Sequence, residues 1–249
     1  MLRQVLTSGL IAAGAIVLPT LSAEAALLIG VQFPHGQNAD STHALVPTQT
    51  AGVIPQASFN AITALTASNV ALVDSLATAT AVTFSISATD AWHTGIWVDG
   101  YSNANFTLVS GKVGAAWDAN GSTYTFGNVA AGTYDLIVYT VNKGDPTSGD
   151  YTVGTKTFYI TQQQGDVGIA GAFDNVWIQA INTINSNTSR DLGNYVRFDG
   201  ITPDKNGNIT LTGSKDAAFN GLQLSAVPEP ASIGLLMISG AILARRRQR

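Results

Sequence analysis

The chain has 249 residues and a net charge of −4, from 12 basic and 16 acidic residues, and it contains no cysteine. Without cysteine it can form no disulfide bridge, no thiolate nucleophile and no cysteine-bound metal site. Between residues 26 and 227, seven basic residues face fourteen aspartates and leave a net charge of −7. Nucleic-acid binding depends on clustered positive charge, so we expect no nucleic-acid partner.

The N-terminus has the parts of a secretory signal peptide. Arg3 supplies a positive charge, Val5–Leu18 is an apolar run, and Ala23 and Ala25 give the small-residue spacing that signal peptidase accepts. Residues 1–25 are therefore predicted to direct the chain to the Sec export machinery and to be removed after Ala25. An uncleaved membrane helix is the alternative, but the run is shorter than the ~20 residues that a span needs.

Residues 26–226 are predicted to form a single all-β domain. Val82, Phe84 and Ile86 alternate with serine and threonine, which is the pattern of a half-buried strand. Strand-like segments separated by turn signals cover residues 27–33, 81–87, 105–111, 122–129, 133–141, 154–161, 194–202, 208–214 and 219–225. About nine strands with short loops favour a two-sheet antiparallel β-sandwich, jelly-roll-like, with minor helix.

Two segments are ambiguous between helix and strand. Ser58–Ser75 begins with a residue that can cap a helix, and Gly171–Ile184 resembles it in pattern. Their β-branched residues weaken both helix predictions. Two Asn-Gly dipeptides, within Asp118–Gly121 and Asp204–Asn208, predict tight hairpin turns, because these residues tolerate a positive φ.

The segment Asp90–Tyr101 combines aromatic and polar side chains. Trp92, Trp97 and Tyr101 can stack on the C–H faces of sugar rings, and Asp99 can bond a sugar hydroxyl, so these four are the candidate ligand-binding residues. The alternative is that the tryptophans fill the sandwich core. Trp92 and Trp97 are five residues apart and would face opposite sides of a regular strand, so one of them is expected to be exposed.

No sequence pattern predicts catalysis or a metal site. His35, Asp40 and His43 lack the spacing of metal ligands, and no serine-hydrolase, zinc-protease or phosphate-loop motif is present. Fourteen aspartates give chance carboxylate pairs in any fold, so a secreted hydrolase is only an alternative. Asp204–Asn208 begins like a calcium loop, but Gly207 comes too early in it. We predict no enzyme activity, no catalytic residue and no cofactor, with a structural calcium ion as an open alternative.

The C-terminus carries a second apolar segment. It reads Val227, Pro228, Glu229, Pro230, then the 14 residues Ala231–Ala244, and then Arg245, Arg246, Arg247 and Arg249 within the last five positions. As a helix the apolar run would reach about 21 Å, against roughly 30 Å for a bilayer core. The arginines are expected to stop transfer and to stay on the cytoplasmic side.

A Pro-Glu-Pro triplet, a short apolar helix and an arginine cluster, in this order, resemble the PEP-CTERM sorting signal. The resemblance covers residues 227–249. It implies that an exosortase, a membrane-embedded cysteine protease, processes the tail in a Gram-negative bacterium that makes exopolysaccharide. An ordinary tail anchor is the alternative, but it leaves the Pro-Glu-Pro triplet unexplained.

The body is also similar to a group of PEP-CTERM proteins. The similarity is carried by AGVIPQASFNAIT at residues 51–63, AAGTYDLIVYT at 130–140, GNYVRFDGIT at 193–202 and AFNGLQLSAVPEP at 218–230. Phe59 and Ala61 depart from the group's pattern, which has tryptophan and asparagine there. The similarity implies a galactose-binding-like jelly roll, and no functional residue carries over from the group.

Together the two resemblances imply an exported envelope or extracellular-matrix protein. It would be tethered to the membrane through its tail before processing by the exosortase, and it would lie on the outer surface or outside the cell afterwards. Association with exopolysaccharide is the expected function, and a carbohydrate-binding module with a defined glycan ligand is the alternative.

Overall fold

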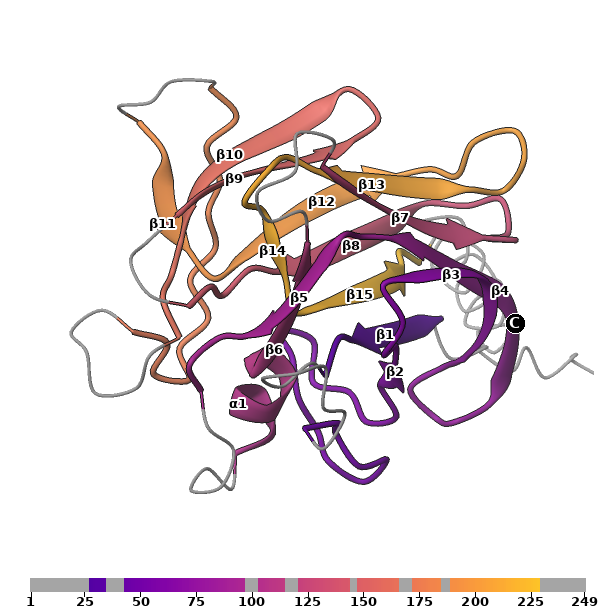
Figure 1. Ribbon diagram of the computed structural model, residues 1–249. Helices are drawn as coiled ribbons and strands as arrows, with labels where there is room; N and C mark the ends of the chain where they lie inside the picture. Colours follow the sequence, from indigo (N-terminus) through magenta and orange to yellow (C-terminus); the bar gives the residue numbers. More distant parts are fainter. Residues whose placement is uncertain are drawn as a thin grey trace, which may run out of the picture.

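The computed structural model describes residues 27–34, 43–96, 103–114, 121–143, 147–165, 172–184 and 189–228. Two large sheets pack face to face, and a small third sheet accompanies them (Figure 1). This confirms the β-sandwich predicted from the sequence, with one short helix among the described residues. The sheets are mainly antiparallel, although each large sheet also contains one parallel pair.

The first large sheet has the strand order β12-β8-β15-β1-β2. Its strands are β1 (Leu28–Gln32), β2 (Asn60–Ala61), β8 (Tyr134–Tyr139), β12 (Tyr195–Ile201) and β15 (Gly221–Ala226). β1 and β15 are antiparallel neighbours, with Leu28 opposite Ser225. The described chain therefore begins and ends side by side, at one end of this sheet.

The second large sheet has the strand order β11-β10-β9-β13-β7-β4-β3. Its strands are β3 (Thr66–Val73), β4 (Ala79–Ser87), β7 (Ser122–Gly127), β9 (Ser148–Val153), β10 (Lys156–Gln162), β11 (Asp191–Gly193) and β13 (Ile209–Gly213). The small sheet has the order β14-β6-β5, and its strands are β5 (Asp90–His93), β6 (Gly111–Gly114) and β14 (Ala218–Phe219). The helix α1 (Ala104–Val109) directly precedes β6.

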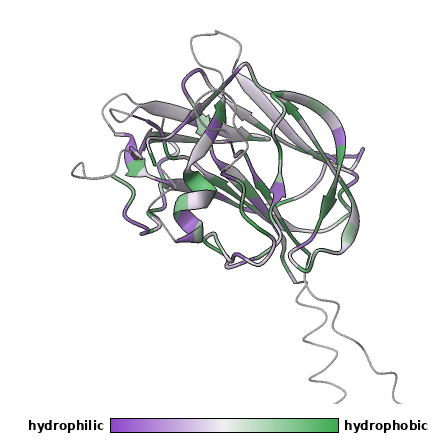
Figure 2. Ribbon diagram, turned by 60° about the horizontal axis from the view of Figure 1, so that its bottom comes forward, coloured by the Kyte–Doolittle hydropathy of each residue, from purple (hydrophilic) through white to green (hydrophobic). Residues whose placement is uncertain are grey.

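The main core lies between the two large sheets and follows the alternation in the sequence. Val82, Phe84 and Ile86 of β4 are buried, as predicted. Phe84 pairs with Phe126 of β7, and their rings meet edge to face at 5.2 Å, an arrangement that adds to the stabilisation from burial. Figure 2 shows hydrophobic stretches running through the strands of the sandwich.

A second core lies on the outer face of the first sheet. Ile137 and Tyr139 of β8 point away from the main core and are nevertheless fully buried. Phe59, α1 and Phe173 cover them. β8 is thus buried on both faces, which explains why its sequence is an almost continuous apolar run rather than an alternating one.

One sequence prediction of element type was wrong, and one ambiguous segment is resolved. Residues 105–111 were expected to form a strand, but α1 occupies most of that range. The side chain of Asn103 caps the helix by accepting a hydrogen bond from the Asn105 backbone N–H at 2.8 Å. The segment Ser58–Ser75, which was ambiguous in the sequence, contains β2 and β3. β-branched residues of β3, including Thr66 and Val70, pair with β4.

The other ambiguous segment has little regular structure, and one of the two predicted turns is described. Residues 172–184, the described part of Gly171–Ile184, form neither helix nor strand apart from a bridge from Gln179 to Tyr195. Asp204–Asn208 is a tight turn with Gly207 at φ +76°. It is not a hairpin within one sheet, since it joins β12 of the first sheet to β13 of the second. Residues 118–120 of the other predicted turn lie outside the described residues.

Within the described residues, no helix is long and apolar enough to cross a membrane. The predicted signal peptide and the apolar run Ala231–Ala244 both lie outside that part of the chain.

Candidate functional site

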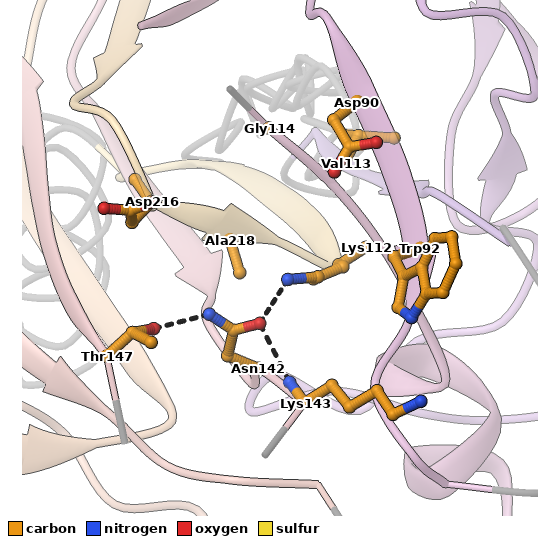
Figure 3. A pocket seen from close by; sticks show the side chains of 11 residues that line it. Asp90, Trp92, Lys112, Val113, Gly114, Asn142, Lys143, Thr147, Asp216 and Ala218 are labelled. Atoms are coloured by element: carbon orange, nitrogen blue, oxygen red, sulfur yellow. Dashed lines mark hydrogen bonds between the residues drawn. The ribbon is translucent and has the colours of Figure 1, made fainter. Parts of the chain in front are cut away.

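A cavity of about 420 Å³ opens beside the small sheet (Figure 3). We call it the Trp92 cavity. Its polar and aromatic lining comes from five places in the chain: β5, β6, the residues after β8, the residue before β9 and the residues before β14. The side chains that define it are Asp90, Trp92, Lys112, Asn142, Lys143 and Asp216.

The pairing of β5 with β6 sets the geometry of the cavity. Asp90 and Trp92 are two residues apart on β5 and so lie on the same face of the strand. Trp92 is directly opposite Lys112, and Asp90 is directly opposite Gly114. A Cβ at Gly114 would lie 2.4 Å from the Ala217 carbonyl oxygen. Only glycine therefore lets the segment before β14 approach this closely.

Trp92 is partly exposed at the cavity, with 40% of its surface accessible. Its ring stacks on the neighbouring His93 ring, with the centroids 5.7 Å apart. The Lys143 Nζ lies 5.8 Å from the centre of the Trp92 ring and 3.0 Å from His93 Nε2. Among the large hydrophobic side chains that the described residues expose, Trp92 is the aromatic one.

Asn142 organises the floor of the cavity, as Figure 3 shows. Its Oδ1 accepts hydrogen bonds from Lys112 Nζ and, at 2.8 Å, from the backbone N–H of Lys143. Its Nδ2 donates to Thr147 Oγ1. Asn142 is itself buried, so these bonds fix its amide and with it the end of the Lys112 side chain.

Lys112 is an ammonium group partly removed from water. Burial lowers the pKa of Lys112, because it weakens the hydration of the charged form. Asp90 and Asp216 act in the opposite direction and raise that pKa, while Lys143 lowers it further. The two aspartates therefore help to keep a half-buried lysine charged.

These groups suit polar recognition better than catalysis. An aromatic face beside ammonium, carboxylate and amide groups can hold a polyhydroxylated ring from several sides. Within the described ranges, no three histidine, aspartate or glutamate side chains come together as metal ligands. Asp90 is only half-buried and Asp216 is exposed. Neither carboxyl thus has the apolar surroundings that a general acid of a glycosidase needs.

The structure describes one of the four residues predicted for this site. Trp92 lines the cavity, but Trp97, Asp99 and Tyr101 lie outside the described residues. Trp177 packs against the second core and not in the sandwich core that the alternative predicted, with its ring 4.8 Å from Tyr139 and 5.0 Å from Phe173.

Sequence reasoning missed four residues of the cavity. Lys112, Asn142, Lys143 and Asp216 stand in different segments with no motif in common. The one available signal was the alternation of Asp90 and Trp92, which predicts that both side chains face the same way.

The other predicted residues have local roles or lie outside the described chain. The Oδ1 atom of Asp204 accepts backbone N–H bonds from Asn206 at 2.8 Å and Asn208 at 2.9 Å. These bonds lower the pKa of Asp204, and they identify it as a turn residue. Val227 donates its N–H to the Thr133 carbonyl at 2.8 Å, and Pro228 is exposed. The residues beyond the described part are His35, Asp40, Ala23, Ala25, Glu229, Pro230, Arg245, Arg246 and Arg247.

The chain matches no protein family, no curated protein and no solved structure at a significant level. The functional argument therefore depends on the cavity and on the sequence.

Proposed function

We propose that this chain is an exported bacterial surface or matrix protein that binds exopolysaccharide through the Trp92 cavity. The observation that carries the proposal is the partly exposed Trp92 ring beside a polar cavity. A tryptophan in a sandwich core is ordinary, but one held at a cavity by His93 and Lys143 offers a flat apolar surface for a sugar ring. Asp90, Lys112 and Lys143 can then bond the hydroxyl groups around that ring.

The cavity favours a defined glycan over loose association with a polymer. A smooth polar surface would bind many polysaccharides weakly, whereas a concave site with a few fixed polar groups selects by shape and hydrogen bonding. The hydrogen-bonded amide of Asn142 is one such fixed group. Trp92 and Lys112, which lie opposite each other on β5 and β6, supply an aromatic face and an ammonium group. The carbohydrate-binding module is therefore the more specific form of the same proposal.

The proposed route to the surface is the one that the two chain ends imply. Signal peptidase would remove residues 1–25, and an exosortase would act on the tail that begins at Val227. The pairing of β1 with β15 supports this route. Cleavage after residue 25 and near Val227 would leave only a few residues beyond this strand pair.

Binding can be tested with the full-length chain in mild detergent on an array of bacterial polysaccharides. We expect Trp92→Ala to weaken binding at least tenfold, a loss of about 1.4 kcal/mol. The matched control is Leu76→Ala, which removes a side chain that is 71% exposed in a turn outside the cavity. Equal binding by the original chain and the Trp92 variant would contradict the proposal.

Sorting can be tested by the intact mass of the protein recovered from culture fluid and from membranes. We expect the exported form to lack residues 1–25 and to have lost the arginine cluster. A chain that keeps its arginines in cells with an active sorting protease would contradict the sorting part of the proposal and leave the binding part standing.

A further inference from the structure

The two lysines of the Trp92 cavity differ from the arginines of the same domain. Arg190 pairs with Asp150 at 2.6 Å, and Arg197 pairs with Asp135 at 2.6 Å. Among the residues that the structure describes, neither Lys112 nor Lys143 has a carboxylate within ion-pair distance. The two arginines are thus neutralised directly by carboxylates. At the cavity, the Lys112 ammonium instead contacts the neutral amide of Asn142, and the Lys143 ammonium contacts the His93 ring.

The Lys112 ammonium is the better placed of the two to bind an anion. It has three N–H donors, of which Asn142 Oδ1 takes one. It is also partly shielded from water, and attraction between charges is stronger in such surroundings than in bulk solvent. A ligand carboxylate in the cavity would replace the lost hydration with charge-assisted hydrogen bonds.

Trp92 links this anion site to a sugar ring. Side chains directly opposite on antiparallel strands lie about 5 Å apart at Cβ, and Trp92 and Lys112 are such a pair. Lys143 reaches the same ring from the segment after β8. A sugar stacked on Trp92 would therefore have an ammonium group within reach on two sides.

The aspartates make a plain inorganic anion a poor match for the whole cavity. Asp90 and Asp216 line other parts of the wall than the lysine ends, as Figure 3 shows. Carboxylates accept hydrogen bonds from hydroxyl groups and repel a second anion. The complementary ligand carries one carboxylate on the lysine side and hydroxyl groups on the aspartate side.

From this arrangement we infer that the Trp92 cavity selects a uronate-type sugar unit, so that the polysaccharide it binds is acidic. The inference rests on the proposed function and specifies the chemical class of its ligand. The carboxylate of the sugar contacts Lys112, the ring stacks on Trp92, and Lys143 bonds a ring substituent. Because the domain as a whole is negative, this selection depends on the local lysines and not on long-range attraction.

The test compares each polymer with its own neutral form. The probes are polygalacturonate and alginate, each together with its carboxyl-reduced derivative, and affinity for the full-length chain is measured by titration calorimetry in mild detergent. We expect at least one acidic polymer to bind ten times more tightly than its reduced form. Lys112→Met should abolish this preference, so that the two forms of each polymer bind within twofold of each other. The control Lys156→Met removes a lysine that lies over Phe158, outside the cavity, and should change nothing.

The outcomes separate this inference from the proposed function. Equal affinity for acidic and reduced polymers, with loss of both on Trp92→Ala, overturns the acidic selection and leaves polysaccharide binding intact. An acidic preference that Lys156→Met weakens as much as Lys112→Met also overturns it, since the attraction would then be general. Failure to bind any of the four polymers overturns the uronate assignment, and the array with Trp92→Ala then decides the proposed function separately.

Discussion

The outer faces of the two large sheets meet different surroundings. On the second sheet that face carries threonine and serine, including Thr83 and Thr125. The Thr125 hydroxyl lies 3.4 Å from the Thr210 hydroxyl on this face. On the first sheet the outer face carries Ile137 and Tyr139, and a layer of loops and α1 seals it from water. The difference teaches that a strand sequence reports its surroundings on both sides. Alternation marks a face open to water, and a continuous apolar run marks a second covering layer.

Buried amide side chains fasten the covering layer to the first sheet. Gln32 of β1 donates to the carbonyls of His43 at 3.0 Å and Thr107 at 2.8 Å. Gln223 of β15 donates to the Ile54 carbonyl at 2.7 Å and accepts from the Tyr139 hydroxyl. Such bonds inside a protein are costly to break, because each buried group that is left without a partner has lost its water as well.

The same layer supports the Trp92 cavity. Asn220, between β14 and β15, donates to the carbonyl of Gly111 at 2.8 Å and also to that of Val109 at 3.3 Å. Its Oδ1 accepts the Val141 N–H. These contacts hold the start of β6, which carries Lys112, and the segment that leads to Asn142 and Lys143. The covered sheet therefore positions one side of the cavity. The second sheet holds another side from its buried face, where Gln162 of β10 donates to Thr147 Oγ1 at 3.0 Å and to the Asp216 carbonyl at 2.8 Å.

The largest effect is expected from breaking this network. Asn220→Ala leaves several buried backbone groups without partners and should lower the free energy of unfolding by about 3 kcal/mol. Chemical denaturation of the full-length chain in detergent measures this. Thr210→Ala on the open sheet is the matched control and should cost less than about 0.5 kcal/mol. Similar losses for the two variants would remove the distinction between the sheets.

A smaller effect is expected at the close contact between β6 and the segment before β14. Gly114→Ala places a Cβ against the Ala217 carbonyl oxygen and should cost about 2 kcal/mol by overpacking. Gly154→Ala gives a comparison, because a Cβ there meets no atom within 4 Å and only the φ of +57° opposes it. That strain should cost about 1 kcal/mol. A Gly114 variant as stable as the original chain would show that the segment before β14 can move away from β6 at little cost in stability.

Alkaline pH should give the smallest effect per residue and involve both cores. Burial raises the pKa of Tyr139 in the covering layer and of Tyr124 between the sheets. A phenol whose folded pKa is raised contributes its full stability below the unfolded pKa, near 10, and loses it as pH rises above that value. The loss should be about 1 kcal/mol per buried tyrosine at pH 10.5.

Denaturation midpoints between pH 8 and 11 test this, with Tyr139→Phe as the comparison. The variant should be less stable at pH 8, because Val53 N–H and Gln223 lose a partner. It should also lose less stability than the original chain between pH 9 and 11. Parallel pH curves for the two chains would mean that Tyr139 does not resist ionisation.

The fold was more predictable from the sequence than the site. Val82, Phe84 and Ile86 reveal their strand because a period of two survives in the sequence. The segment at residues 105–111 misleads, because Phe106 and Leu108 alternate like a strand while the Asn103 cap and the covering layer favour a helix. Local propensity cannot decide a segment of this length, since tertiary packing overrides it.

The cavity could be predicted only in part. Asp90 and Trp92 are close in sequence, so the strand period places them together. Asp216 reaches the same cavity through the pairing of β6 with β14, and Asn142 reaches it through hydrogen bonds to Lys112 and Thr147. No local signal encodes these long-range contacts. Within the described part of the chain Lys112 has a neutral amide and no carboxylate as its partner. This depends on where the charges fall in the fold, which a single sequence does not show.

The most direct test of the central claim is hydrogen exchange of the full-length chain with and without the acidic polymer that binds most tightly. We expect exchange to slow in peptides that cover residues 90–96, 110–114, 140–143 and 214–219, which surround the Trp92 cavity. The strands of the open sheet, β3 and β4 above all, should exchange at unchanged rates. Slowing on the open sheet with no change around Trp92 would contradict the claim that this cavity is the binding site.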